Sequence, residues 1–235
     1  MGFEIDHSDP TEPHTSSTVD QSISGLRLHA LEMGALVIEQ VANAAKALLD
    51  RNAALAQSVL AREPLVDQFD RQLDHDSLTF IALQKPVAND LRLSRAIVRM
   101  GRELERAGDE AKKIARFALT LEQATGNDPV LAVARHLRHM ASLSVSMLRS
   151  AVRAADEVDP AMAEAVLKRD AELDAEFAAA LRQIMSYVLQ DHRFLRPTID
   201  TIFALKGLER IGDHATNVAE QVLYMVGREP HADAA

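Results

Sequence analysis

The sequence predicts an all-α fold made of two pseudo-symmetric three-helix bundles, with six long helices in total. Apolar residues recur at intervals of three and four through long stretches, which is the pattern of amphipathic helices. The chain has 235 residues, of which 47% are apolar and only 4% aromatic, and this composition favours helices packed on helices over sheets. An internal repeat divides the chain into two comparable halves.

Helix-breaking residues separate the six predicted helices. In chain order they are Arg51-Asn52, Lys85-Pro86, Gly126-Asn127-Asp128-Pro129, Asp159-Pro160, Arg196-Pro197 and, near the end, Gly227 with Pro230. We take the cluster at 126–129 as the boundary between two bundles, at 19–125 and 126–228. Residues 1–18 are polar and are predicted to form a disordered N-terminal tail, and 229–235 form a C-terminal tail.

Two pairs of matching segments carry the internal repeat. Residues 59–67 read VLAREPLVD and align with 166–174, which read VLKRDAELD. Further on, residues 104–111 read LERAGDEA and align with 208–215, which read LERIGDHA. The matching segments fall on the second and third helices of each half, so those helices are equivalent elements.

Cysteine content and charge exclude several classes of function. The chain has no cysteine, so disulfides and thiolate metal sites are excluded, and any metal ion is held by oxygen or imidazole. A formal charge of -9, with no basic patch recognised, predicts that nucleic acid is not a partner. No stretch reaches the roughly 18 apolar residues of a spanning helix, so we expect a cytoplasmic protein without direct membrane insertion.

Four pairs of acidic residues, each four positions apart, lie on the repeated helices. They are Glu63 with Asp67, Glu105 with Asp109, Asp170 with Asp174, and Glu209 with Asp213. Residues four apart share a helical face, and two like charges so placed destabilise a helix by about 0.2–0.5 kcal/mol. Facing pairs bridged by a hard cation would be neutralised, so all eight residues are candidate metal ligands. Asp70 and Asp74 extend the first stripe.

Glycines at matching positions predict that the acid-bearing helices pack closely. Gly108 and Gly212 each lie in an apolar seam. Because glycine inside a helix costs about 1 kcal/mol relative to alanine, its presence at both matching positions suggests that another helix backbone passes close there. Pro64, between the acids of the first pair, leaves open whether Glu63 and Asp67 share a face.

An ordinary alternative is that the acids pair with cations on a solvated face. The candidate cations are Arg102, Arg106, Lys112, Arg169 and Arg210. Among the histidines, we interpret His136 and His139 as surface residues and His214 as a candidate outer ligand.

Residues 208–220, LERIGDHATNVAE, closely resemble the signature of the PhoU family, and 104–111 resemble its first-half counterpart. The segment NDLR at 89–92 also looks like the family's loop before the third helix, and the resemblance spans about 19–228. It implies two three-helix bundles, a homodimer, and divalent or trivalent metal ions (Mg, Mn, Zn or Fe) on the four acid pairs.

The same resemblance implies a regulator of phosphate uptake and homeostasis that keeps the phosphate-starvation response off. Its partners would be the ATPase subunit of a phosphate ABC transporter and a membrane sensor histidine kinase. The resemblance implies an adaptor that couples transporter and kinase. We recognise no nucleophile elbow and no glycine-rich phosphate loop, so we do not expect an enzyme. The alternatives are a metal-dependent phosphohydrolase, whose turnover Asp109→Ala would abolish, and a metal-storing helical bundle.

Overall fold

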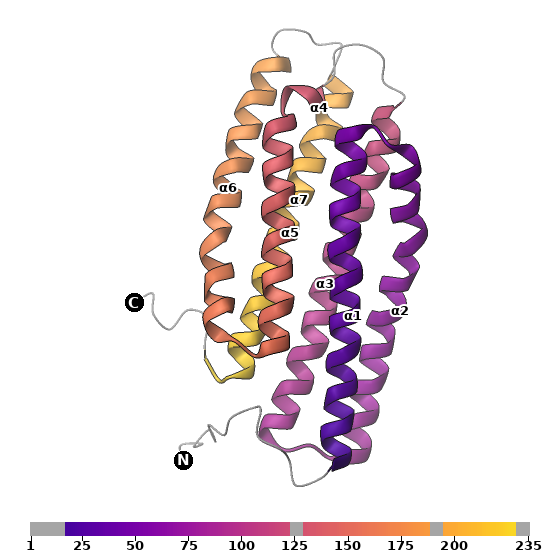
Figure 1. The fold of residues 1–235 in the computed structure, drawn as a ribbon, viewed down its shortest axis with the longest axis vertical. Helices are drawn as coiled ribbons and strands as arrows, with labels where there is room; N and C mark the ends of the chain where they lie inside the picture. The colour runs from indigo at the N-terminus through magenta and orange to yellow at the C-terminus, as the bar shows by residue number, and fades with distance from the viewer. Residues whose placement is uncertain (1–16, 123–128, 189–194, 229–235) are drawn as a thin grey trace.

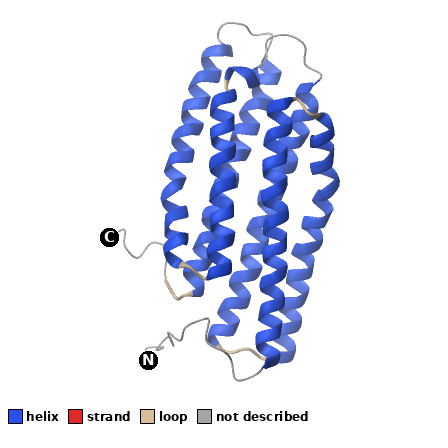
Figure 2. Cartoon of the chain, in the orientation of Figure 1, coloured by secondary structure: helices blue, strands red, loops and turns tan. Residues whose placement is uncertain are grey.

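The computed structural model describes residues 17–122, 129–188 and 195–228, and its regular elements are all helices (Figure 2). They are α1 (Ser17–Asp50), α2 (Ala53–Gln84), α3 (Ala88–Glu122), α4 (Pro129–Ala132), α5 (Ala134–Glu157), α6 (Pro160–Val188) and α7 (Leu195–Met225). The predicted all-α fold with six long helices is confirmed, and the four-residue α4 is an addition to it.

The long helices form two three-helix bundles that lie side by side with their axes nearly parallel (Figure 1). The first bundle contains α1, α2 and α3, and the second contains α5, α6 and α7. The bundles meet where α3 packs on α7 and α1 packs on α5, whereas α2 and α6 lie on the outer edges. Each half therefore has one acid-bearing helix at the bundle interface and one at the outside.

Local capping explains why the helices end at the predicted breakers. The Asn52 side chain accepts a hydrogen bond of 3.0 Å from the backbone N–H of Leu55 and caps α2. Lys85 ends α2 in the left-handed region at φ 48°, just before Pro86. In the second half, Asp159 Oδ1 accepts from the backbone N–H groups of residues 161 and 162, which starts α6.

Two prolines do not end helices. Pro197 lies in the first turn of α7, where its missing N–H costs nothing. Pro64 lies inside α2, which continues through it to Gln84. Almost all of the predicted 1–18 tail, residues 126–128 of the predicted boundary and the whole of 229–235 fall outside the described residues.

A neighbouring helix packs closely on both glycines, but the nearest atoms belong to its side chains, whereas the sequence had suggested its backbone. A Cβ atom built on Gly108 of α3 would lie 3.3 Å from Val66 Cγ1 of α2. One built on Gly212 of α7 would lie 2.2 Å from Leu173 Cδ2 of α6. Val66 and Leu173 are equivalent in the repeat, so the same contact brings the acid-bearing helices together in each half.

Within residues 17–122, 129–188 and 195–228, no helix combines the length and the apolar character needed to cross a membrane.

Candidate functional site

The candidate metal-ligating residues form two clusters, one in each bundle. The first cluster lies between α2 and α3 and consists of Glu63, Asp67, Asp70, Asp74, Glu105 and Asp109. The second cluster lies between α6 and α7 and consists of Asp170, Asp174, Glu209 and Asp213. In both bundles the acids flank the glycine contact described above.

Carboxylates from both helices crowd one another in the first cluster. Burial raises the pKa of Glu105, and the charges of Asp109, Asp70 and Asp67 raise it further. Burial likewise raises the pKa of Asp70, with the charge of Asp74 adding to the effect and Arg102 opposing it. Acids on α2 therefore lie within electrostatic reach of acids on α3, as the repeat predicted, and Asp70 is a full member of the cluster.

One end of the first cluster already contains a cation. The Lys112 ammonium group, from α3, is hydrogen-bonded to Glu63 Oε1 of α2 and lies 3.5 Å from Asp109 Oδ1. The hydrogen bond to Glu63, together with the two carboxylate charges, raises the pKa of Lys112. Glu63 thus faces α3 despite the neighbouring Pro64, and at this end the ordinary ion-pair interpretation holds. Arg102 pairs in the same way with Asp74, at 2.8 Å.

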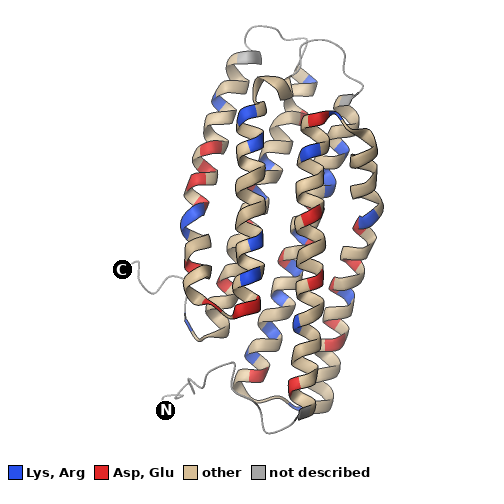
Figure 3. Cartoon of the chain, in the orientation of Figure 1, with Lys and Arg blue, Asp and Glu red and all other residues tan. Residues whose placement is uncertain are grey.

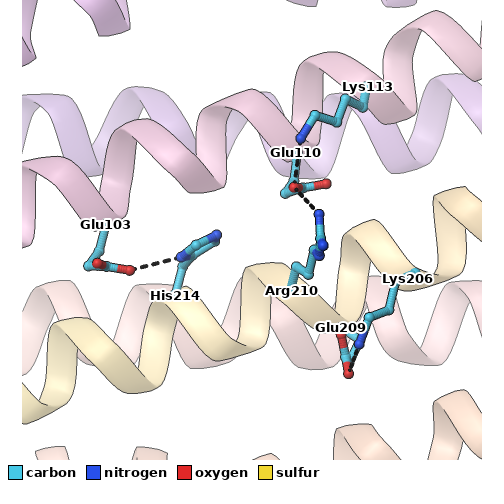
Figure 4. A network of polar contacts seen from close by, with 7 residues as sticks. All are labelled: Glu103, Glu110, Lys113, Lys206, Glu209, Arg210 and His214. Atoms are coloured by element: carbon cyan, nitrogen blue, oxygen red, sulfur yellow. Dashed lines mark hydrogen bonds and ion pairs between the residues drawn. The ribbon is translucent and has the colours of Figure 1, made fainter.

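The second cluster is less well compensated. Burial raises the pKa of Asp170, and the charges of Asp174 and Glu209 raise it further. Burial is also the largest cause that raises the pKa of Asp213, and the charges of Glu209 and Asp170 raise it further. The positive charge of Lys206 lowers this pKa and so opposes the shift. Lys206 also contacts Glu209 Oε1, on its own helix (Figure 4).

Two oxygen atoms of the second cluster are buried without a hydrogen-bond partner among the described residues. They are Asp170 Oδ1 and Glu209 Oε2, and Glu209 as a whole is only 8% exposed. A buried carboxylate oxygen without a partner is costly, and the atoms that best satisfy it are hydrogen-bond donors or a hard cation. The donor chemistry of the second cluster therefore fits Mg, Mn or oxygen-bound Fe.

The described residues do not contain three or more His, Asp or Glu side chains already gathered closely enough to hold an ion. The clusters are groups of acids within electrostatic reach of one another rather than preformed coordination spheres. Metal binding by the eight predicted residues accordingly stays a prediction.

Removing one of the crowded charges is expected to stabilise the metal-free protein. The folded state binds protons at Asp213 more tightly than the unfolded state does, so stability falls as the pH rises from the ordinary pKa through the raised one. At pH 7, Asp213→Asn should therefore raise Tm by roughly 1–3 °C with a chelator present. The gain should shrink as the pH is lowered towards about 4, the ordinary pKa of aspartate.

Thermal unfolding followed by circular dichroism at several pH values would measure this gain. Asp156→Asn is the control for the loss of an acid. The Asp156 side chain is 57% exposed on α5 and its ion pair with Arg27, at 3.9 Å, lies at the surface and contributes little, so Tm should stay nearly unchanged. An Asp213→Asn protein that melts below the wild type at pH 7 would contradict the electrostatic interpretation.

A separate polar network joins the two bundles (Figure 4). His214 Nδ1 and Asn217 Nδ2 of α7 each donate a hydrogen bond of 2.9 Å to Glu103 Oε2 of α3. Arg210 of α7 and Lys113 both donate to the buried Glu110 Oε1 of α3, at 3.2 and 2.8 Å. His214 is bonded to the other bundle, so the expectation that it serves as an outer ligand of the second cluster is wrong.

This network also fixes the protonation of Glu103. Burial alone would raise its pKa, but the hydrogen bonds from His214 and Asn217, with the charges of His214 and Arg106, lower the pKa below its ordinary value. Glu103 is therefore a stable anion at the contact between α3 and α7.

The burial of His136 also contradicts the sequence prediction. A surface position was expected, but His136 is only 5% exposed. Its Nδ1 lies 2.6 Å from Glu176 Oε1 and its Nε2 lies 2.8 Å from Gln183 Oε1, both on α6. His139, by contrast, is 49% exposed as predicted. The sequence feature that could have predicted the burial of His136 is the apolar stripe of α5, in which the neighbouring Leu137 and Met140 are fully buried.

A group of arginines on α3 was not expected from the sequence. Arg99, Arg102 and Arg106 line an open groove of about 350 Å³, and the same groove is lined by the acids Glu103 and Glu220 and by the amides Asn217 and Gln221. The arginines are three and four residues apart, a spacing that continues back to Arg95 and places them on one helical face. The groove therefore has mixed charge, and no local sequence pattern indicated it because its residues come from both α3 and α7.

Comparison with known proteins identifies the arrangement. The family model described as PhoU domain matches the chain twice, at residues 30–118 and 137–222. The chain belongs to the PhoU family. The two matched segments correspond to the two bundles, and each contains one cluster and one copy of the repeated Leu-Glu-Arg-x-Gly-Asp string.

Relatives in the PhoU family match nearly the whole chain. A phosphate-specific transport system accessory protein PhoU homolog of Pseudomonas aeruginosa is 37% identical over 220 residues, which cover 94% of this chain and 90% of that protein. A protein of the same description from Rhizobium meliloti is 33% identical over 221 residues, covering 94% and 92%.

Solved PhoU structures have the same fold. The crystal structure of PhoU from Pseudomonas aeruginosa superposes with a TM-score of 0.85 at 37% identity, covering 88% of this chain and 98% of that one. The phosphate transport system regulatory protein PhoU from Streptococcus pneumoniae has a TM-score of 0.79 at 24% identity, with 88% and 96% covered. The latter comparison supports the fold alone.

Proposed function

We propose that this protein is a cytoplasmic regulator of phosphate uptake and phosphate homeostasis that holds the phosphate-starvation response off when phosphate is abundant. The observation that carries the proposal is the match, over 94% of the chain, to relatives described as phosphate-specific transport system accessory proteins. Both copies of the acid-bearing string are retained in this chain, so the whole PhoU architecture and not one half of it supports the role.

In this proposal the protein is an adaptor and not an enzyme. It acts as a homodimer between the ATPase subunit of a phosphate ABC transporter and a membrane sensor histidine kinase, through contacts made by charged helical surfaces. The long helices support such a role because charged residues are spread along most of their length (Figure 3). The helices α2 and α6, at the outer edges, each have more acidic than basic residues, and we expect them to receive basic partner segments.

The second part of the proposal concerns the acid clusters, which would hold divalent or trivalent metal ions. A bound ion supplies positive charge to acids that otherwise raise one another's pKa, and it would satisfy Asp170 Oδ1 and Glu209 Oε2. Each cluster draws its acids from two helices, so an ion between them would also fix the spacing of α2 with α3 and of α6 with α7.

The adaptor role is tested by association with the predicted partners. Tagged protein is expected to retain the transporter ATPase subunit or the sensor kinase of its own organism, in a manner that depends on phosphate or nucleotide. Failure to retain either partner under every phosphate and nucleotide condition would remove the main support for an adaptor. A phosphatase screen with added Mn²⁺ completes the test, because turnover lost in Asp109→Ala would instead establish a metal-dependent hydrolase.

A further inference from the structure

Lys112 and Thr216 occupy equivalent places in the repeat, seven residues after Glu105 and Glu209. The Lys112 ammonium group joins acids from two helices, because it is bonded to Glu63 of α2 and lies 3.5 Å from Asp109 of α3. The equivalents of those two acids are Asp170 and Asp213. The Thr216 hydroxyl group brings no charge to them and donates a 2.7 Å hydrogen bond to the backbone carbonyl of Asp213.

Lys206 does not replace Lys112 in the second cluster. Among the described residues its carboxylate contact is with Glu209 Oε1, three residues away on the same helix, and its ammonium group lies 5.4 Å from the centre of the Phe177 ring. Asp170 Oδ1 and Glu209 Oε2 stay buried and without a partner. The second cluster therefore presents unsatisfied oxygen atoms from both of its helices. Asp170 is the equivalent of Glu63, which Lys112 neutralises in the first cluster, and Glu209 is the equivalent of Glu105.

A lysine ammonium group and a hard metal ion are attracted by the same arrangement of carboxylates, and one excludes the other by charge repulsion. We propose that Lys112 is a built-in counter-cation that takes the place of a metal ion between Glu63 and Asp109. The two halves are then unequal, and the tight metal site is the one built on Asp170, Glu209 and Asp213. This inference rests on the proposed metal binding and specifies which acids achieve it.

The structure also indicates how the first cluster differs beyond Lys112. Asp70 and Asp74 have Phe177 and Leu181 as their equivalents in the second half, and Asp74 is paired with Arg102 at 2.8 Å. The first cluster thus carries more acids but also bridging basic side chains that already satisfy some of them. Arg102 has Lys206 as its equivalent in the second cluster, where Lys206 contacts Glu209. The cation that the first cluster has and the second lacks is therefore Lys112, and an ion that binds in the first cluster would meet it as an additional competitor.

Exchange of the two equivalent residues tests this proposal on the full-length protein, with Mn²⁺ as the probe and calorimetric titration as the readout. In the wild type, tight Mn²⁺ binding should disappear in Asp213→Asn and persist in Asp109→Asn. Lys112→Thr should double the amount of tightly bound Mn²⁺, because it gives this position the residue of the second cluster and removes the competing ammonium group. Thr216→Lys should weaken the tight site by about tenfold or more.

Lys46→Thr, at an exposed position of α1, is the matched control for loss of a lysine and should bind as the wild type does. Equal binding in the two halves of the wild type, with no effect of Lys112→Thr or Thr216→Lys, would overturn the inequality while leaving metal binding intact. Absence of Mn²⁺ binding in every protein, Lys112→Thr included, would overturn the metal proposal itself. If Lys112→Thr fails to fold, Thr216→Lys decides, since unchanged tight binding in that variant contradicts the proposal.

Discussion

Gly212→Val is expected to destabilise the protein by about 3 kcal/mol and to lower Tm by roughly 6–12 °C. Even a single Cβ atom at this position would lie 2.2 Å from Leu173 Cδ2, and Leu173 is fully buried between α6 and α7. Valine adds two methyl groups to that Cβ atom, so the Leu173 side chain must change its position within the packed contact between α6 and α7. Thermal unfolding followed by circular dichroism would measure the loss.

Two matched glycine variants show whether the loss comes from the helix contact. A Cβ atom added to Gly25 of α1 would have no neighbouring atom within 4 Å, so Gly25→Val should change stability by less than about 0.5 kcal/mol. Gly108→Val should destabilise the protein more than Gly25→Val and less than Gly212→Val, because a Cβ atom at position 108 would lie 3.3 Å from Val66 Cγ1. If the Tm of Gly212→Val equals that of the wild type, α6 and α7 are not packed as described.

Mn²⁺ is expected to raise the Tm of the wild type substantially. An ion that binds only the folded state stabilises it by about 2.7 kcal/mol at a hundredfold excess over Kd, which corresponds to roughly 5–11 °C for a chain of this size. The double variant Asp170→Asn with Asp213→Asn should show no such rise, because it removes the acids of the second cluster that lack bridging cations.

An exposed acid on another helix separates metal binding from a general charge effect. Asp156→Asn removes one such acid from α5 and should keep the full Mn²⁺-induced rise, and excess chelator should reverse the rise in both this variant and the wild type. Equal shifts in the wild type and the double variant would place the ion elsewhere and remove the second cluster from the proposal.

Much of the fold could be predicted from the sequence because it depends on local rules. Breakers such as Asn52 and Asp159 act through capping bonds to residues two or three positions away, so their effect is visible in the sequence. The matched glycines Gly108 and Gly212 likewise indicated close packing, and the repeat placed the acids of both clusters on facing helices.

The remaining features depend on which helix faces meet across the molecule, and local patterns do not determine this. His214 follows the acid Asp213 in sequence, yet it points to Glu103 because α7 packs on α3 of the other bundle. Lys112 was one of several candidate cations for a solvated face, and only the contact between α2 and α3 places it on Glu63. His136 is buried because α6 covers that face of α5.

The most direct test of the proposed regulatory role is alkaline phosphatase activity in a strain that lacks the gene, grown in abundant phosphate. Activity should be high in the deletion strain and should fall to the wild-type level when the gene is restored. Restoration with Gly25→Val should work equally well, since that substitution meets no neighbouring atom. Activity that is low in the deletion strain and unchanged on restoration would contradict the role of this protein as a negative regulator of the phosphate response.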